Sequence, residues 1–213
     1  ALNAAQDGET VELLQDVHVT STSSDANQAP ALTIKTGITL EGNGCTIYAE
    51  NFTTGGNDGT SAINSILDVN ASDVRIYNLN IVGDGTAKHG VNAYCVDDVI
   101  IDGVSVTGAA GYALVVNSSN VVVKDMTTSG NGWGSVNVES KDSTKTSGLE
   151  IKGGTFEDLV SVKVEQGASA PVSTVTITDG EFSGWVGIAA SGTGSSIQAS
   201  GGTFTQTLDK AYI

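Results

Sequence analysis

Short apolar runs recur along the chain, and within each run apolar and polar positions alternate as they do in β-strands. Seven segments align without gaps on one pattern: apolar–any–apolar, then a small or polar pair, then a closing apolar or Thr position. They are ITLEGNGC (38–45), VRIYNLNI (74–81), VIIDGVSV (99–106), VVVKDMTT (121–128), LEIKGGTF (149–156), VTITDGEF (175–182) and IQASGGTF (197–204). Their starts lie 36, 25, 22, 28, 26 and 22 residues apart. The pattern predicts two short strands with a bend between them, repeated along the chain.

A further short strand is predicted before most of these segments. These strands are SILDV (65–69), GVNAY (90–94), YALVV (112–116), SVNVE (135–139), SVKVE (161–165) and VGIAA (186–190). Only Gly, Asn, Asp and Ser separate the strands, which leaves no room for the crossover helix of a βαβ unit. Three strands per repeat without helices favour a coil whose turns stack about 4.8 Å apart in parallel sheets. The sequence therefore predicts one all-β domain, a parallel β-solenoid of about eight rungs.

The alignment also predicts which side chains stack inside the coil. The third position of each segment carries Leu40, Ile76, Ile101, Val123, Ile151, Ile177 and Ala199. The last position carries Cys45, Ile81, Val106, Thr128, Phe156, Phe182 and Phe204. Cys45 is interpreted as a small core residue, although an extra residue in its segment leaves open whether Ile47 takes that place. Cys45 and Cys95 fall in different columns, so no disulfide is expected.

Composition narrows the classes of partner. The 213 residues carry a formal charge of −15 and a single arginine, which excludes the Lys and Arg contacts that nucleic acid or an anionic membrane surface requires. No apolar run approaches the ~18 residues of a membrane span, so no membrane insertion is expected. Ser, Thr, Asn and Gly supply most of the polar surface, a composition typical of secreted bacterial β-proteins.

Several segments resemble rungs of the right-handed parallel β-helix proteins, the pectate-lyase-like superfamily. They are GITLEGNGCTI (37–47), CVDDVIIDG (95–103) and NSSNVVVKD (117–125). AAQDGETVELL (4–14) resembles the family's lead-in to the first rung, and SGGTFTQ (200–206) resembles rungs of large bacterial surface proteins. The resemblance implies one β-helix domain over 1–213, with 1–9 the remnant of an N-terminal cap and 205–213 a C-terminal cap or linker. The abrupt start predicts a monomeric module excised from a longer protein.

The resemblance to galacturonan hydrolases of this fold is incomplete. Those enzymes combine a paired-Asp motif, a Gly-His-Gly and an Arg-x-Lys. The chain has Asp97–Asp98 and His89–Gly90, but no glycine precedes His89 and no Arg-x-Lys follows. Two aspartates adjacent in a predicted turn are better explained by local hydrogen bonding than by the separated carboxylates of hydrolysis.

A calcium-dependent polysaccharide lyase is the enzymatic alternative. Asp73 and Asp98 fall in one column on neighbouring rungs, and with Asp97 they would offer oxygen ligands to Ca²⁺. Arg75, with Lys124 farther along, would supply the basic groups. The competing interpretation is an ordinary surface ion pair without a cofactor.

Three aromatic residues beside glycines, Tyr112, Trp133 and Trp185, recur after the last strand of a rung. They would form a flat platform for sugar rings or close the core at a corner, and the usual burial of large aromatics favours the second. Two insertions at equivalent points, Ser140–Gly148 and Gln166–Ser173, predict neighbouring loops on one edge.

Lys141, Asp142 and Lys145 are the polar binding candidates in the first of these insertions. A third insertion, Asn51–Ala62, would protrude near the N-terminal end.

We therefore expect a non-catalytic, adhesin-type module of a secreted or surface-anchored bacterial protein. It would bind a host or environmental glycan or glycoprotein through edge loops and exposed strand faces. Mucin or immunoglobulin as host partners follows from the resemblance alone. The lyase centred on Arg75 and a purely structural spacer remain the alternatives.

Overall fold

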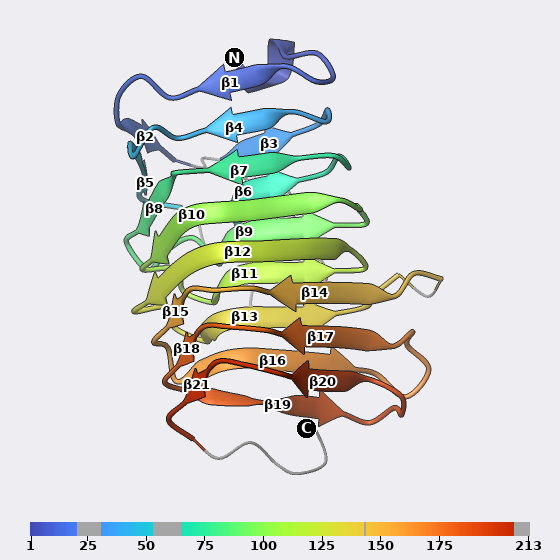
Figure 1. Ribbon diagram of the computed structural model, residues 1–213. Helices are drawn as coiled ribbons and strands as arrows, with labels where there is room; N and C mark the ends of the chain where they lie inside the picture. The colour runs from blue at the N-terminus through green and yellow to red at the C-terminus, as the bar shows by residue number, and fades with distance from the viewer. Residues whose placement is uncertain (21–30, 53–64, 143, 207–213) are drawn as a thin grey trace.

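The computed structural model describes residues 1–20, 31–52, 65–142 and 144–206. The chain winds into a right-handed parallel β-solenoid, and the strands follow one another in chain order from one end of a rod to the other (Figure 1). Every strand pairing among the described residues is parallel, and the only helix there is a 3₁₀ turn at Leu2–Ala4. The expected all-β solenoid is confirmed, with about seven turns.

Two sheets form the sides of the rod. The larger contains a path of eight strands: β1 (Thr10–Glu12), β4 (Thr39–Glu41), β7 (Arg75–Tyr77), β10 (Val99–Thr107), β12 (Asn120–Ser129), β14 (Ser147–Ile151), β17 (Ser173–Ile177) and β20 (Ser196–Ala199). Six further strands extend it around a bend: β2 (Val17–Val19), β5 (Thr46–Ala49), β8 (Asn80–Gly83), β15 (Thr155–Phe156), β18 (Glu181–Phe182) and β21 (Thr203–Phe204). The bend is the interruption that the sequence repeat predicted.

The second sheet has seven strands. They are β3 (Leu32–Ile34), β6 (Ser65–Val69), β9 (His89–Tyr94), β11 (Tyr112–Asn117), β13 (Gly134–Glu139), β16 (Val160–Gln166) and β19 (Trp185–Ala190). Six of them contain the additional strands predicted from the sequence. We refer to the side of this sheet that faces away from the core as the outer face.

The strand register confirms the first predicted core column and corrects one member of the second. Leu40 pairs with Ile76, and the column continues through Ile101 to Ala199 as expected. In the other column Ile47, not Cys45, pairs with Ile81. The reason is a turn at 42–45, where Asn43 and Gly44 both have positive φ, so that the second strand begins one residue after Cys45.

Three phenylalanines close the core toward the C-terminal end. The rings of Phe156 and Phe182 stack with centroids 4.9 Å apart, and those of Phe182 and Phe204 with centroids 4.8 Å apart. The separations match the rise of one rung, because parallel pairing places each ring directly over the last. Offset aromatic stacks of this kind add to the free energy gained from apolar burial.

The corners of the coil bring backbones into close approach. Gly108 has φ +72°, and a Cβ at this position would lie 2.1 Å from the carbonyl oxygen of Gly83 on the preceding rung. Only glycine fits both conditions. Cys45 and Cys95 are both free. Within the described part of the chain, no helix has the length and apolar character needed to cross a membrane.

Candidate functional site

The three aromatic residues singled out in the sequence lie where the chain enters the seven-stranded sheet. The indoles of Trp133 and Trp185 are 46% and 38% exposed, whereas Tyr112 is 7% exposed. Tyr112 is buried, as the interpretation of a closed corner expects, although the contiguous hydrophobic core of the described residues does not include it. For the two tryptophans, which keep much of their surface in solvent, the expectation of burial is wrong. The inward position beside Tyr112 is Ala113, and a Cβ on the corresponding Gly90 would meet Val106 at 2.4 Å. Small residues fill that corner, and the large rings turn outward.

His89, Tyr112 and Trp133 form one cluster, which we call the aromatic corner. Tyr112 stacks on His89 with centroids 6.0 Å apart, and Trp133 meets both rings edge-on at 5.9 and 5.8 Å. The ammonium of Lys88 lies 5.5 Å from the centroid of the Trp133 ring system, within the range of a cation–π interaction. The indole is therefore fixed in place while much of its surface stays open to solvent.

His89 supports this cluster in its neutral form. Burial lowers its pKa to about 3, and the positive charges of Lys88 and Lys141 act in the same direction. Its Nδ1 accepts a hydrogen bond of 3.1 Å from the backbone N–H of Tyr112. The hydrogen-bonded ring is buried.

An apolar strip continues from the aromatic corner along successive rungs. Trp133 and Leu159 occupy equivalent positions, one residue before β13 and β16, and the backbone N–H of Trp185 donates to the carbonyl of Leu159 at 2.9 Å. Leu159 is 89% exposed. Adjacent rungs lie about 4.8 Å apart. We call Trp133, Leu159 and Trp185 the apolar ledge.

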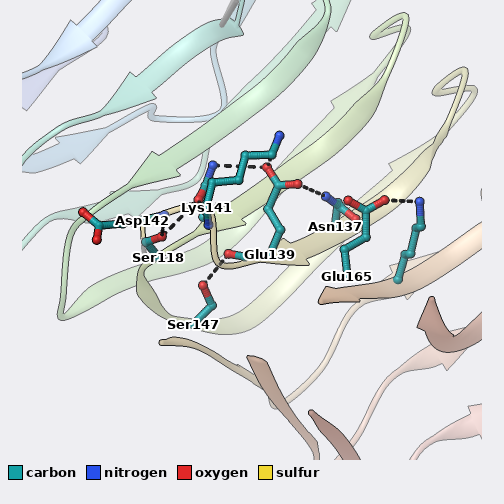
Figure 2. Close-up of polar contacts among 9 residues, drawn as sticks. Ser118, Asn137, Glu139, Lys141, Asp142, Ser147 and Glu165 are labelled. Atoms are coloured by element: carbon teal, nitrogen blue, oxygen red, sulfur yellow. Dashed lines mark hydrogen bonds and ion pairs between the residues drawn. The ribbon is translucent and has the colours of Figure 1, made fainter. Parts of the chain in front are cut away.

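A polar cluster lies farther along the same strands on the outer face. The carboxylate of Glu139 accepts hydrogen bonds from the side-chain amides of Asn117 at 3.1 Å and Asn137 at 3.2 Å, and lies 2.9 Å from the ammonium of Lys141 (Figure 2). Burial raises the pKa of Glu139, while the neighbouring Lys141 acts to lower it. Three donors around a buried carboxylate are what a charged group needs in order to be stable there.

Glu165 continues this cluster on the next rung, in register with Glu139. Its carboxylate pairs with Lys163. Burial acts to raise the pKa of Glu165, but the hydrogen bond and charge of Lys163 outweigh it and hold the pKa below its ordinary value. Burial acts to lower the pKa of Lys163, but Glu165 raises it and the nearby Tyr112 acts in the same direction, so the polar cluster adjoins the aromatic corner. We call Asn137, Glu139, Lys141, Lys163 and Glu165 the polar cluster.

A second buried carboxylate lies nearer the N-terminal end of the outer face. Asp68 is in register with Asn92, and its Oδ1 accepts a hydrogen bond of 3.4 Å from the Asn92 amide. Burial raises the pKa of Asp68 to about 7, and the hydrogen bond from Asn92 acts against that shift.

The two described edge loops lie side by side, as expected. The hydroxyl groups of Ser140 and Ser173 are 3.2 Å apart, and the N–H of Ser147 donates to the carbonyl of Val172 at 3.3 Å. The predicted loop Asn51–Ala62 lies outside the described residues except for its first two positions.

The three polar candidates of the first loop are engaged with the solenoid. Lys141 lies across Glu139, and the N–H of Asp142 donates to the Ser118 hydroxyl at 2.9 Å. Lys145 forms an ion pair of 3.1 Å with Asp97. The loop is therefore pinned to the coil at three points, and it places Lys141 at the edge of the polar cluster.

The residues of the lyase alternative lie on the other sheet. One guanidinium nitrogen of Arg75 donates to the carbonyls of Asp98 at 2.5 Å and Val74 at 3.1 Å. Asp97 accepts a hydrogen bond of 2.6 Å from the Asn120 amide as well as pairing with Lys145.

Lys124 lies 3.7 Å from Asp102, on a strand separated from that of Arg75 by β10. Asp73 and Asp98 occupy equivalent turn positions, both with positive φ. Among the described residues, no group of three or more His, Cys, Asp or Glu side chains could hold a metal ion. The calcium-dependent alternative stays a prediction.

Of the polar cluster, the sequence interpretation singled out only Lys141, although a signal for the two glutamates is present. Glu139 and Glu165 close the equivalent strands SVNVE and SVKVE, so like charges were placed side by side. Such pairs are unfavourable unless cations accompany them.

A separate hollow of about 510 Å³ opens at the N-terminal end of the coil. Its lining is polar and apolar in about equal parts, and the apolar residues include Val11, Leu13, Val17, Leu32, Leu40 and Ile47. These are the first members of the core columns, so the hollow is the end of the hydrophobic interior.

Comparisons of the chain with protein-family models, with curated proteins and with solved structures find no match.

Proposed function

We propose that this chain is a non-catalytic carbohydrate-binding module, of the adhesin type, that works outside a bacterial cell. Its binding surface is the outer face of the seven-stranded sheet, from the apolar ledge to the polar cluster. The observation that carries the proposal is the half-exposed indole of Trp133, held edge-on by Tyr112 and His89 beside buried hydrogen-bonding groups. Sugar-binding sites combine these two elements, because sugar rings present apolar faces and hydroxyl-bearing edges.

The rigidity of the aromatic corner supports binding over a purely structural role. An exposed indole adds nothing to the free energy of apolar burial in the core. Two ring contacts and the cation–π contact of Lys88 nevertheless hold it in one orientation. A side chain that is already ordered loses little conformational entropy when a ligand stacks on it. A spacer would have no use for such an arrangement on its solvent side.

The charge distribution supports a sugar ligand over the anionic substrate of a polyuronate lyase. The chain carries −15 overall, and the side chain of its single arginine is bonded to two backbone carbonyls. A polyanion would approach against this field.

The test is binding of the purified chain to immobilised glycans, comparing the wild-type protein with Trp133→Ala and Tyr48→Ala. Tyr48 is a matched control, because it is an aromatic residue stacked on a histidine, His18, at 4.9 Å on the other sheet. We expect binding that Trp133→Ala weakens at least tenfold and Tyr48→Ala leaves unchanged. Absence of binding to every glycan, or equal loss in both variants, would overturn the proposal.

A further inference from the structure

We propose that the polar cluster is the subsite that reads the hydroxyl groups of an uncharged sugar, with the amide oxygen of Asn137 as its central acceptor. This inference rests on the proposed function and adds the class of ligand to it: neutral glycans, with uronates and other acidic sugars rejected.

The starting observation is a buried acceptor without a donor. Asn137 is 4% exposed, and its amide nitrogen donates to Glu139 Oε2 at 3.2 Å. Its Oδ1 has no hydrogen-bond partner among the described residues. Buried polar atoms are nearly always hydrogen-bonded, because an unmade bond leaves the cost of desolvation uncompensated. A ligand that supplies a donor at this point would remove that cost.

The neighbours of Asn137 restrict what the ligand can be. Figure 2 shows the Asn137 side chain between those of Glu139 and Glu165, so that the acceptor lies among further acceptor atoms. Each nearby lysine is paired with the glutamate two residues away in the sequence, Lys141 with Glu139 and Lys163 with Glu165. The group that fits must therefore donate hydrogen bonds and carry no negative charge, and a sugar hydroxyl meets both conditions.

Tyr112 connects this subsite to the aromatic surface. Its ring passes over Gly134, where a Cβ would lie 3.3 Å from Tyr112 Cε1, and its side chain lies near that of Lys163. Trp133 comes directly before Gly134, the first residue of β13, and Asn137 lies three residues after Gly134 on the same strand. One strand thus carries the stacking surface at its start and the acceptor farther along, which allows one oligosaccharide to reach both.

Acidic sugars would meet opposing charge at the same place. A uronate carboxylate at Asn137 would face the carboxylates of Glu139 and Glu165. Glu139 already has three donors around it, and Glu165 is already paired with Lys163. Like charges brought together in a partly desolvated site repel strongly. Glu165 therefore acts as a specificity determinant even without direct contact with the sugar.

The experiment uses matched polysaccharide pairs that differ in charge: galactan against polygalacturonate, mannan against polymannuronate, and glucan against polyglucuronate. Affinity is measured for the wild-type chain, Trp133→Ala, Asn137→Leu and Glu165→Gln, with circular dichroism and thermal melting as checks of folding. We expect wild-type protein to bind a neutral member at least tenfold more tightly than its acidic counterpart. Asn137→Leu should weaken neutral binding about tenfold, the effect of one hydrogen bond.

Glu165→Gln keeps the shape and removes the charge, so it should raise the affinity for the acidic member relative to the neutral one. This ratio tests the inference even where Asn137→Leu fails to fold. A ratio that Glu165→Gln leaves unchanged overturns the inference, as does a wild-type preference for the acidic member. If Trp133→Ala loses binding and folded Asn137→Leu binds as tightly as the wild-type chain, the subsite is overturned and the proposed function stands. If the wild-type chain binds none of the polysaccharides, both the subsite and the proposed function are overturned.

Discussion

The indole of Trp133 meets the ring of Tyr112 edge-on, with centroids 5.8 Å apart, and Tyr112 in turn lies near Lys163, two rungs away from its own strand. Through this relationship an exposed aromatic surface and a buried polar cluster become one continuous feature of the outer face. The parallel register creates it, because each rung places equivalent residues about 4.8 Å from the last. Substituting Tyr112 would therefore disturb both parts at once.

The apolar ledge should contribute to binding over more than one rung. Trp185→Ala is expected to weaken glycan binding about three- to tenfold, because loss of one stacking contact is typically worth about 1 kcal/mol. Isothermal titration with a bound oligosaccharide would measure the change. Unaltered affinity in Trp185→Ala, together with loss in Trp133→Ala, would limit the binding surface to the aromatic corner.

Lys141 should stabilise the fold through its carboxylate partner. The Lys141 side chain is largely solvated, so Lys141→Met is expected to lower the free energy of unfolding by only about 1 kcal/mol. In the Glu139→Gln background the same substitution should cost less, because the buried charge is gone. A denaturant-based double-mutant cycle measures this coupling, and strictly additive effects would show that the ion pair contributes nothing.

Asp68 should make stability depend on pH. Its pKa rises from about 4 in the unfolded chain to about 7 in the fold, so the folded state holds the additional proton between these values. Wild-type stability from this group is complete below pH 4 and declines as the pH rises toward 7. Asp68→Asn lacks the decline and should gain on the order of 3 kcal/mol relative to wild type across that window.

Thermal or urea unfolding of both proteins from pH 4 to pH 8 would test this. The neutral His89 has the opposite pH dependence, since its lowered pKa destabilises the fold as the pH falls below about 6.5. That contribution is common to both proteins and cancels in the difference. A difference that stays constant over the whole range would contradict the buried, protonated state of Asp68.

The phenylalanine stack should be a main source of stability near the C-terminal end. Phe182 is buried between Phe156 and Phe204, and Phe182→Ala should lower the free energy of unfolding by about 3–5 kcal/mol through cavity formation and lost stacking. Phe204 is only partly buried, so Phe204→Ala should cost less. Equal costs in urea unfolding would contradict this dependence on burial and on stacking from both sides.

The fold could be predicted from the sequence largely through the length of the repeat and the alignment of equivalent core positions. Alternation assigned the strands, and gapless alignment placed Ile76 over Leu40, because a parallel coil brings equivalent residues into register. This alignment could not show that Ile47, not Cys45, occupies the core column, since the length of a turn decides which residue starts the next strand. Similarly, whether Trp133 points inward depends on the space left at the corner by Gly90 and Ala113, which alternation does not reveal.

The polar cluster apart from Lys141 was missed for a different reason. Outward positions of strands are ordinarily solvated, and Asn137 and Glu139 looked like surface residues in SVNVE. They are buried because side chains from a neighbouring rung and from the following loop pack against them, among them Asn117 and Lys141, which both contact the Glu139 carboxylate. Such coverage depends on three-dimensional neighbours, which the local pattern of one strand does not specify.

The most direct test of the account is a map of amide and indole chemical shifts in the ¹⁵N-labelled chain during titration with a neutral oligosaccharide. The account predicts shifts at the indole N–H of Trp133 and at the backbone amides of Asn137 and Glu139, with the amides around Arg75 unchanged. Shifts confined to the surface around Arg75 and Asp98, on the opposite sheet, would contradict it.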